Sequence, residues 1–274
     1  MLSSTTVAVR IRPLSATEKS NGVVSCCYCL NDNVVAIKKE ASGGYLKSQM
    51  GGLSEYGFDS VFDESSSQRE VYEKTTKPYL SNLIEGLNVT VFAYGATGAG
   101  KTHTMMGNSR CDNSSNNADA GIIPNALVDV FALIDAKKRV SANAEEFQVL
   151  VSFIEVYNEQ VYDLLEPTGR VLQIREDQEK GVVVVAGVTE RQAASPDAVL
   201  GYLTEGNINR KTEATMANQV SSRSHAVLQL TLRYVRTDIL PCTRDELEST
   251  HKTNEHALEL QPLATNGLRP NEYD

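Results

Sequence analysis

The chain has 274 residues, of which 41% are hydrophobic and 22% are charged, and its formal net charge is −9. This length suits one large α/β domain or two small ones, and the apolar fraction is enough for a substantial core. The acidic balance argues against a general nucleic-acid binder and against a protein of anionic membrane surfaces. The sequence contains neither a signal-peptide pattern nor an apolar run of about 18 residues, so we expect no membrane insertion and a cytoplasmic location.

Short strands are predicted in the first part of the chain, over residues 5–11, 34–37 and 56–62, where apolar and β-branched residues recur. Cys26, Cys27 and Cys29 have no second Cys/His cluster at zinc-site spacing, so we interpret them as small, buried, reduced residues of a further strand. A helix is predicted over 67–87. Ser67 is a candidate N-cap, and Pro78 should bend the helix.

The following stretch contains the pattern G-x-x-x-x-G-K-T, formed by Gly95, Gly100, Lys101 and Thr102. Residues 89–94 before it predict a buried strand, and a strand before with a helix after is the context of a phosphate-binding P-loop. Glycines let backbone amides approach an anion closely, while the lysine would reach the β- and γ-phosphates and the threonine hydroxyl would bind Mg²⁺. A glycine-rich turn that matches by chance is the alternative, and the complete context argues against it. The sequence therefore predicts binding of a nucleoside triphosphate.

The rest of the chain alternates helices and strands. Helices are predicted over 121–138, 158–165 and 195–209, with Pro196 at the first turn of the last, and strands over 146–157, 171–174, 181–188 and 225–235. No internal repeat and no domain boundary appear before about residue 236. Residues 237–274 contain eight acidic and three basic residues without a sustained strand pattern. We expect a largely disordered acidic tail, at most weakly helical over 245–260.

Three stretches, residues 92–105, 152–165 and 218–225, together resemble the kinesin motor domain. The resemblance runs from about residue 6 to 236, and the sequence at 75–78 and 181–184 looks most like that of the eighth kinesin class. The resemblance implies an α/β P-loop NTPase fold with a mixed, mostly parallel central sheet flanked by helices. It also implies an ATPase that uses ATP and Mg²⁺ and acts as a motor on microtubules of the cytoplasmic cytoskeleton.

The resemblance also assigns roles to individual residues. Arg10, Arg12 and Pro13 would frame the adenine, with Tyr72 packing near it. Asn218 opens the first switch loop, in which Ser221 would help to position the attacking water and Ser222 would complete the Mg²⁺ shell with Thr102. Arg223 would lose the glutamate with which the family pairs it. The phosphate cradle and its next residue would be Gly95, Ala96, Thr97, Gly98, Ala99, Gly100, Lys101, Thr102 and His103.

One part of the family's pattern is missing from this sequence. Kinesin motors continue into a strand that ends in D-x-x-G-S-E, the second switch, and no D-x-x-G occurs after Ser224. In the family the missing strands flank the P-loop strand, so we expect residues 1–236 to be the N-terminal two-thirds of a motor domain with an incomplete sheet. We therefore expect residues 1–274 not to be a competent motor. The alternatives are a nucleotide-binding fragment without motor activity and an unrelated P-loop kinase or GTPase, and the lack of N-K-x-D argues against a GTPase.

Overall fold

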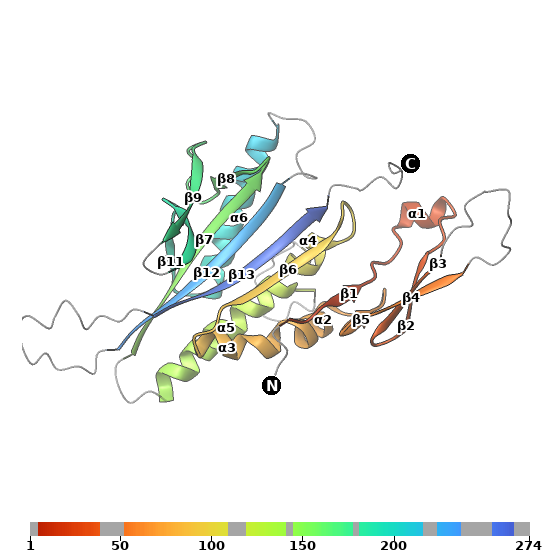
Figure 1. Cartoon of the computed structure of the whole chain (residues 1–274), viewed down its shortest axis with the longest axis horizontal. Coiled ribbons are helices and arrows are strands. Elements are labelled where there is room, and N and C mark those ends of the chain that lie inside the picture. The colour runs from red at the N-terminus through yellow and green to blue at the C-terminus, as the bar shows by residue number, and fades with distance from the viewer. Residues whose placement is uncertain are drawn as a thin grey trace, which may run out of the picture.

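The centre of the molecule is an eight-stranded sheet in the order β10-β9-β8-β7-β12-β13-β6, with β11 paired to β7 (Figure 1). The structure is a computed structural model that describes residues 5–38, 52–108, 119–140, 145–177, 181–215, 224–236 and 254–265. The strands are β6 (Val89–Ala96), β7 (Glu145–Tyr157), β8 (Gln160–Asp163), β9 (Val171–Asp177), β10 (Val182–Ala186), β11 (Arg191–Ala193), β12 (Ser224–Arg236) and β13 (Asn254–Thr265).

All the described helices except α1 pack together on one face of this sheet. They are α2 (Gln68–Thr75), the 3₁₀ helix η1 (Lys77–Tyr79), α3 (Leu80–Ile84), α4 (Lys101–Met106), α5 (Ile122–Val140) and α6 (Pro196–Thr215). α5 is the centre of the layer, because it contacts α2, α3, α4, α6 and β7 and buries its apolar face in the core. The helix predicted over 67–87 is present as two short helices, α2 and α3, and ends at Ile84, and the bend predicted at Pro78 is confirmed. The Ser67 hydroxyl caps α2 by accepting a hydrogen bond from the Glu70 amide. Pro78 lies in the 3₁₀ turn that separates α2 from α3.

Two small sheets precede this layer. β1 (Ala8–Arg10) pairs in parallel with β5 (Ser60–Phe62), and β2 (Cys27–Asn31), β3 (Val34–Lys38) and β4 (Leu53–Gly57) form an antiparallel sheet next to the short helix α1 (Ala16–Ser20). This three-stranded sheet lies at the far end of the molecule from β9 (Figure 1). The prediction of buried cysteines is wrong here, since Cys26 is exposed and Cys27 and Cys29 are partly exposed on the edge strand β2.

The predicted α/β class is confirmed, but the expected mostly parallel pairing is not. Among the described residues, β13 and β6 form the one parallel pair of the main sheet, and its other ladders are antiparallel. The strands from β7 to β10 follow one another through short connections, and strands joined by tight turns run in opposite directions.

A hairpin replaces the helix predicted over 158–165, and that prediction is wrong. Asn158 and Glu159 have φ values of 50° and 62°, and Tyr157 pairs directly with Gln160 across the turn. Two consecutive left-handed residues give a two-residue loop whose twist matches that of the flanking strands. β8 then returns along β7 and buries Val161 in the core.

A strand also occupies part of the segment for which none is expected. β13 lies between β12 and β6 (Figure 1), and it pairs with β12 over Asn254–Leu260 and with β6 over Leu258–Thr265. Pro262 lies beyond the end of the β12 ladder, so its missing N–H interrupts pairing on one side of β13 at most. The prediction of a tail without strands is therefore wrong for 254–265, and this strand fills the position beside β6 that the sequence left empty. Residues 237–253 and 266–274 lie outside the described residues.

Candidate nucleotide-binding site

The P-loop is the turn between β6 and α4, so the predicted order of strand, loop and helix is confirmed. The predicted burial of the strand is wrong, because Phe92 and Tyr94 are exposed on alternate positions of β6. Gly98 and Gly100 have φ values of 81° and 93°, a left-handed conformation that strains any residue with a side chain. The amide of Ala99 donates to the carbonyl of Ala96 at 3.0 Å and closes the turn. Glycine is thus required at positions 98 and 100 by the backbone path itself.

Several groups that suit a phosphate chain converge at this loop. The first hydrogen bond of α4 runs from the Thr104 amide to the Gly100 carbonyl at 2.9 Å, so the amides of residues 101–103 have no acceptor within the helix. The Lys101 ammonium donates to the carbonyls of Gly95, at 2.6 Å, and Ala96, at 3.0 Å. Partial burial lowers the pKa of Lys101 below its ordinary value. An ammonium beside outward amides matches a polyanion.

The residue after Lys101 supplies an oxygen ligand to the same place. Thr102 has an exposed side chain, and no described residue hydrogen-bonds to its hydroxyl. Hydroxyl oxygen is a hard ligand of the kind that Mg²⁺ accepts, usually together with water and phosphate oxygens. The side chains at the start of α4 therefore fit a phosphate–magnesium group.

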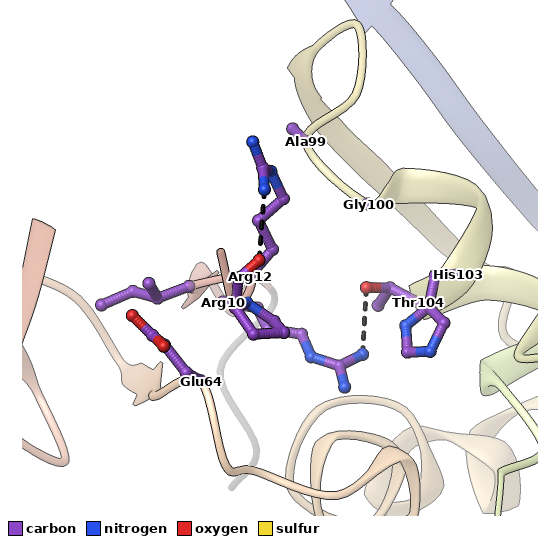
Figure 2. Close-up of a pocket in the computed structure, with 9 residues that line it drawn as sticks. Arg10, Arg12, Glu64, Ala99, Gly100, His103 and Thr104 are labelled. Carbon is purple, nitrogen blue, oxygen red and sulfur yellow. Dashed lines mark hydrogen bonds between the residues drawn. The ribbon is translucent and has the colours of Figure 1, made fainter. Parts of the chain in front are cut away.

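A cavity of about 250 Å³ lies beside the P-loop (Figure 2). This volume lies just below the usual range of small-molecule sites, about 300–1,000 Å³, and is enough for part of a nucleotide. The structure brings together the three residues predicted to frame the adenine, two residues of the predicted phosphate cradle, Ala99 and Gly100, and His103, the residue after the cradle. It adds Ile11, Glu64 and Thr104, for which the sequence predicted no role. The lining consists of Arg10, Ile11, Arg12, Pro13, Glu64, Ala99, Gly100, His103 and Thr104.

The guanidinium of Arg10 forms its hydrogen bonds with other groups of the protein. Its guanidinium donates to Gln68 Oε1 at 2.8 Å, to Thr104 Oγ1 at 3.1 Å and to the Ser66 carbonyl at 3.2 Å. Figure 2 shows this head group turned toward Thr104. Burial lowers the pKa of Arg10 below its ordinary value. Arg10 therefore joins β1 to α2 and α4 and holds one wall of the cavity in place.

Arg12 is placed at the exposed rim of the cavity. Its guanidinium forms two hydrogen bonds with the carboxylate of Glu18, at 2.6 and 2.8 Å, and Figure 2 shows its side chain rising toward Ala99. The hydrogen bond from Arg12, with further bonds from Ser15, lowers the pKa of Glu18 to about 2. The charge of Arg12 is therefore balanced by a neighbour on α1.

Tyr72, which was predicted to pack near the adenine, does not line the cavity. Tyr72 is buried, with 3% of its surface exposed, and its hydroxyl donates to Asp129 Oδ2 on α5 at 2.5 Å. Burial and this hydrogen bond raise the pKa of Tyr72 well above its ordinary value. The structure thus places Tyr72 in the helix layer and not among the residues that line the cavity. Asn218, Ser221, Ser222 and Arg223 lie outside the described residues.

An ion pair with a buried carboxylate supports the start of β12. Arg210 of α6 binds Glu155 Oε1 at 2.9 Å and donates to the hydroxyl and the carbonyl of Ser224, at 2.5 and 3.2 Å. Glu155 is only 3% exposed. The pKa of His225 is lowered by burial and then by the charges of Arg210 and Lys101, so the start of β12 lies within the electrostatic field of the P-loop lysine. Sequence patterns gave no sign of this pairing, which joins residues far apart in the chain.

Comparison with protein-family models gives one family. The model described as the kinesin motor domain matches residues 10–251. The match covers the P-loop, the cavity residues, the hairpin of β7 and β8, and β12.

Similar proteins come from animals and plants. Human kinesin-like protein KIF19 is 39% identical over 229 residues, and mouse KIF18A is 41% identical over 239 residues, each match covering 83% of this chain. KIN-8A of Arabidopsis thaliana is 41% identical over 233 residues, or 85% of this chain. These matches cover only 22%, 25% and 30% of the respective relatives. The chain thus spans between about a fifth and a third of the length of these relatives.

A solved structure has the same fold over most of the chain. The structure, described as that of a fast kinesin, superimposes with a TM-score of 0.78 and 30% sequence identity, and the match covers 98% of this chain and 68% of that one. Among the described residues, no helix is both long and apolar enough to cross a lipid bilayer.

Proposed function

The chain belongs to the kinesin motor-domain family, and from this premise we propose that it is the ATP-binding part of a microtubule-based motor that couples ATP hydrolysis to movement. The kinesin-8 names among its relatives agree with a place in the eighth class. The observation that carries the proposal is the P-loop between β6 and α4, with the cavity directly beside it. The proposed location is the cytoplasmic cytoskeleton, and the proposed partner is the microtubule.

The phosphate-binding role falls to the P-loop. Lys101 would exchange the carbonyl oxygens of Gly95 and Ala96 for phosphate oxygens, which offer a full negative charge in place of a dipole. Thr102 would bind Mg²⁺ through its hydroxyl. The ion, when bound, would neutralise charge on the β- and γ-phosphate oxygens. Because phosphoryl transfer depends on placement and on charge neutralisation, these residues would act mainly by holding the triphosphate in position.

The remaining assignments follow from the family resemblance. Asn218 and Arg223 would contribute to the loop that senses the γ-phosphate, Ser222 to the Mg²⁺ shell and Ser221 to the position of the attacking water. Arg10, Arg12 and Pro13 would surround the adenine. The cavity supports this last assignment, since all three line it together with His103.

Calorimetric titration with MgATP tests nucleotide binding. Lys101→Ala should weaken MgATP binding severely, because it removes the ammonium that balances the phosphate charge. Lys137→Ala, which changes an exposed lysine on α5, is the matched control and should leave binding unchanged. Equal affinity of the Lys101 variant and the parent would refute the P-loop assignment.

ATPase measurements with and without microtubules separate the motor from its alternative. Turnover stimulated by microtubules supports the motor function. Binding of MgATP without stimulated turnover supports a nucleotide-binding unit that does not produce movement. The sequence at the end of β13 makes this test informative. Its last residues, Pro262, Leu263, Ala264 and Thr265, pair with the P-loop strand β6, but they contain neither the aspartate nor the glycine of D-x-x-G.

A further inference from the structure

Gln68, the first residue of α2, is a buried amide directly behind the cavity wall. Only 4% of its surface is exposed, and it is not among the residues that line the cavity. Burying an amide without hydrogen-bond partners is strongly unfavourable, so Gln68 can be buried here only because its amide is hydrogen-bonded. These bonds go to two residues of the cavity wall, Arg10 and His103.

The amide contacts the two residues through its two different ends. Gln68 Oε1 accepts from Nη1 of Arg10 at 2.8 Å, and Gln68 Nε2 donates to the carbonyl of His103 at 2.7 Å. The same nitrogen lies 3.1 Å from Nδ1 and 3.3 Å from Nε2 of the His103 ring. An amide has one acceptor oxygen and two donor hydrogens, so this one side chain holds both the backbone and the ring of His103 against Arg10.

The His103 ring needs such a support because its residue is exposed on the short helix α4. An exposed side chain rotates freely between rotamers, whereas a ring held at one edge presents a fixed planar face. Planar aromatic rings are the surfaces on which nucleic-acid bases stack, largely independent of base sequence. The His103 ring lines the cavity together with Arg12 and Pro13, and Figure 2 shows it beside Thr104 on α4.

We propose that Gln68 is a positioning residue for the nucleotide base: it fixes the His103 ring and the Arg10 side chain as walls of the base compartment. This inference rests on the proposed nucleotide binding at the P-loop. The hydrogen bonds of Gln68 go to Arg10 and His103 and do not involve Lys101 or Thr102. Gln68 therefore acts on the base and not on the phosphates.

Two ligands that share a triphosphate but differ in the base test this role. MgATP occupies both compartments, whereas magnesium tripolyphosphate occupies the phosphate compartment alone. In Gln68→Met, which keeps the bulk of the side chain, MgATP binding should weaken about tenfold, the change expected when a buried hydrogen bond is lost. Tripolyphosphate affinity should stay within about twofold, which a general loss of structure would not allow. Arg69→Ala is the matched control, because that side chain is 71% exposed on the same helix turn and should alter neither affinity.

The outcomes separate this inference from the function on which it rests. A parent chain that binds neither ligand contradicts the nucleotide site and the role of Gln68 together. A parent that binds both ligands, with a Gln68 variant that loses both equally or neither, overturns the positioning role alone. If Gln68→Met lowers the melting temperature, Gln68→Glu decides, since it keeps the acceptor for Arg10 and removes both donors to His103. MgATP affinity equal to that of the parent in Gln68→Glu would also overturn the proposal.

Discussion

Arg10 and Arg210 both join secondary-structure elements near the P-loop, but their charges are balanced in different ways. The guanidinium of Arg10 has neutral partners, the side chains of Gln68 and Thr104 and a backbone carbonyl. Arg210 instead binds the carboxylate of Glu155, which is almost completely buried. A buried carboxylate that loses its partner keeps an uncompensated charge, whereas neutral acceptors lose only a hydrogen bond. The comparison predicts that the two arginines differ strongly in what their removal does to stability.

The largest effect is expected for Arg210→Met. Because Glu155 would remain buried without its cation, we expect the free energy of unfolding to fall by about 3–5 kcal/mol. Chemical denaturation measures this change, and the double variant Arg210→Met/Glu155→Leu should recover most of it. Lys74→Ala provides the contrast, since its ion pair with Glu70 is exposed and should contribute about 0.3–0.5 kcal/mol. A loss below about 1 kcal/mol for Arg210→Met would contradict the distinction between the two arginines.

Gly206→Ala tests how Arg210 reaches Glu155. A Cβ at Gly206 would lie 2.4 Å from Cδ1 of Phe153, so either this buried ring or α6 would have to shift. We expect a loss of about 1–3 kcal/mol from overpacking, and a double-variant cycle should show weaker coupling between Arg210 and Glu155. Gly201→Ala on the same helix is the matched control. It meets no atom within 4 Å and should stabilise the protein by about 0.5–1 kcal/mol. Unfolding data in which both variants behave alike would show that α6 is not seated through Gly206.

Arg10→Met should have a smaller effect on stability than Arg210→Met. Its removal leaves the buried oxygen of Gln68 without its donor, for which we expect about 1–2 kcal/mol. The same denaturation experiment measures it, and the difference between the two arginine variants is the quantity of interest. If the free energy of unfolding falls equally in the two variants, the buried carboxylate of Glu155 is not what makes Arg210 the more important arginine.

The smallest effect is expected for Tyr72→Phe, which removes the hydrogen bond to Asp129 and should cost about 1 kcal/mol near neutral pH. The pKa of Tyr72 is raised above its ordinary value of 10.0 in the folded state, so the folded protein holds the phenol proton more tightly than the unfolded chain. The contribution of Tyr72 is therefore complete below pH 10.0 and is lost as the pH rises above it. Unfolding curves at about pH 9 and about pH 11 should show the parent losing stability relative to the Phe variant. A constant difference between them would contradict this role of the hydroxyl.

Local patterns in the sequence predicted much of the site, and long-range pairing explains most of what they missed. The P-loop was predictable because its glycines, lysine and threonine lie within eight consecutive residues and act through local backbone geometry. Tyr72 was assigned to the adenine by resemblance, yet its helix turns it toward Asp129 on α5. The hairpin at Asn158 and Glu159 was predicted as a helix, since neither residue is a glycine that would have signalled left-handed φ values.

By itself the sequence determined the family, the α/β class, the order of strand, loop and helix around the P-loop, and the bend at Pro78. The P-loop order and the bend follow from residues that are close in the chain, where spacing and backbone preference act directly, and the family and the class follow from several such local stretches taken together. Only the tertiary structure decided that β13 lies between β12 and β6, that Gln68 joins Arg10 to His103, and that Arg210 balances Glu155. These arrangements join residues that are distant in sequence, and their stability comes from burial and pairing that exist only once the chain has folded.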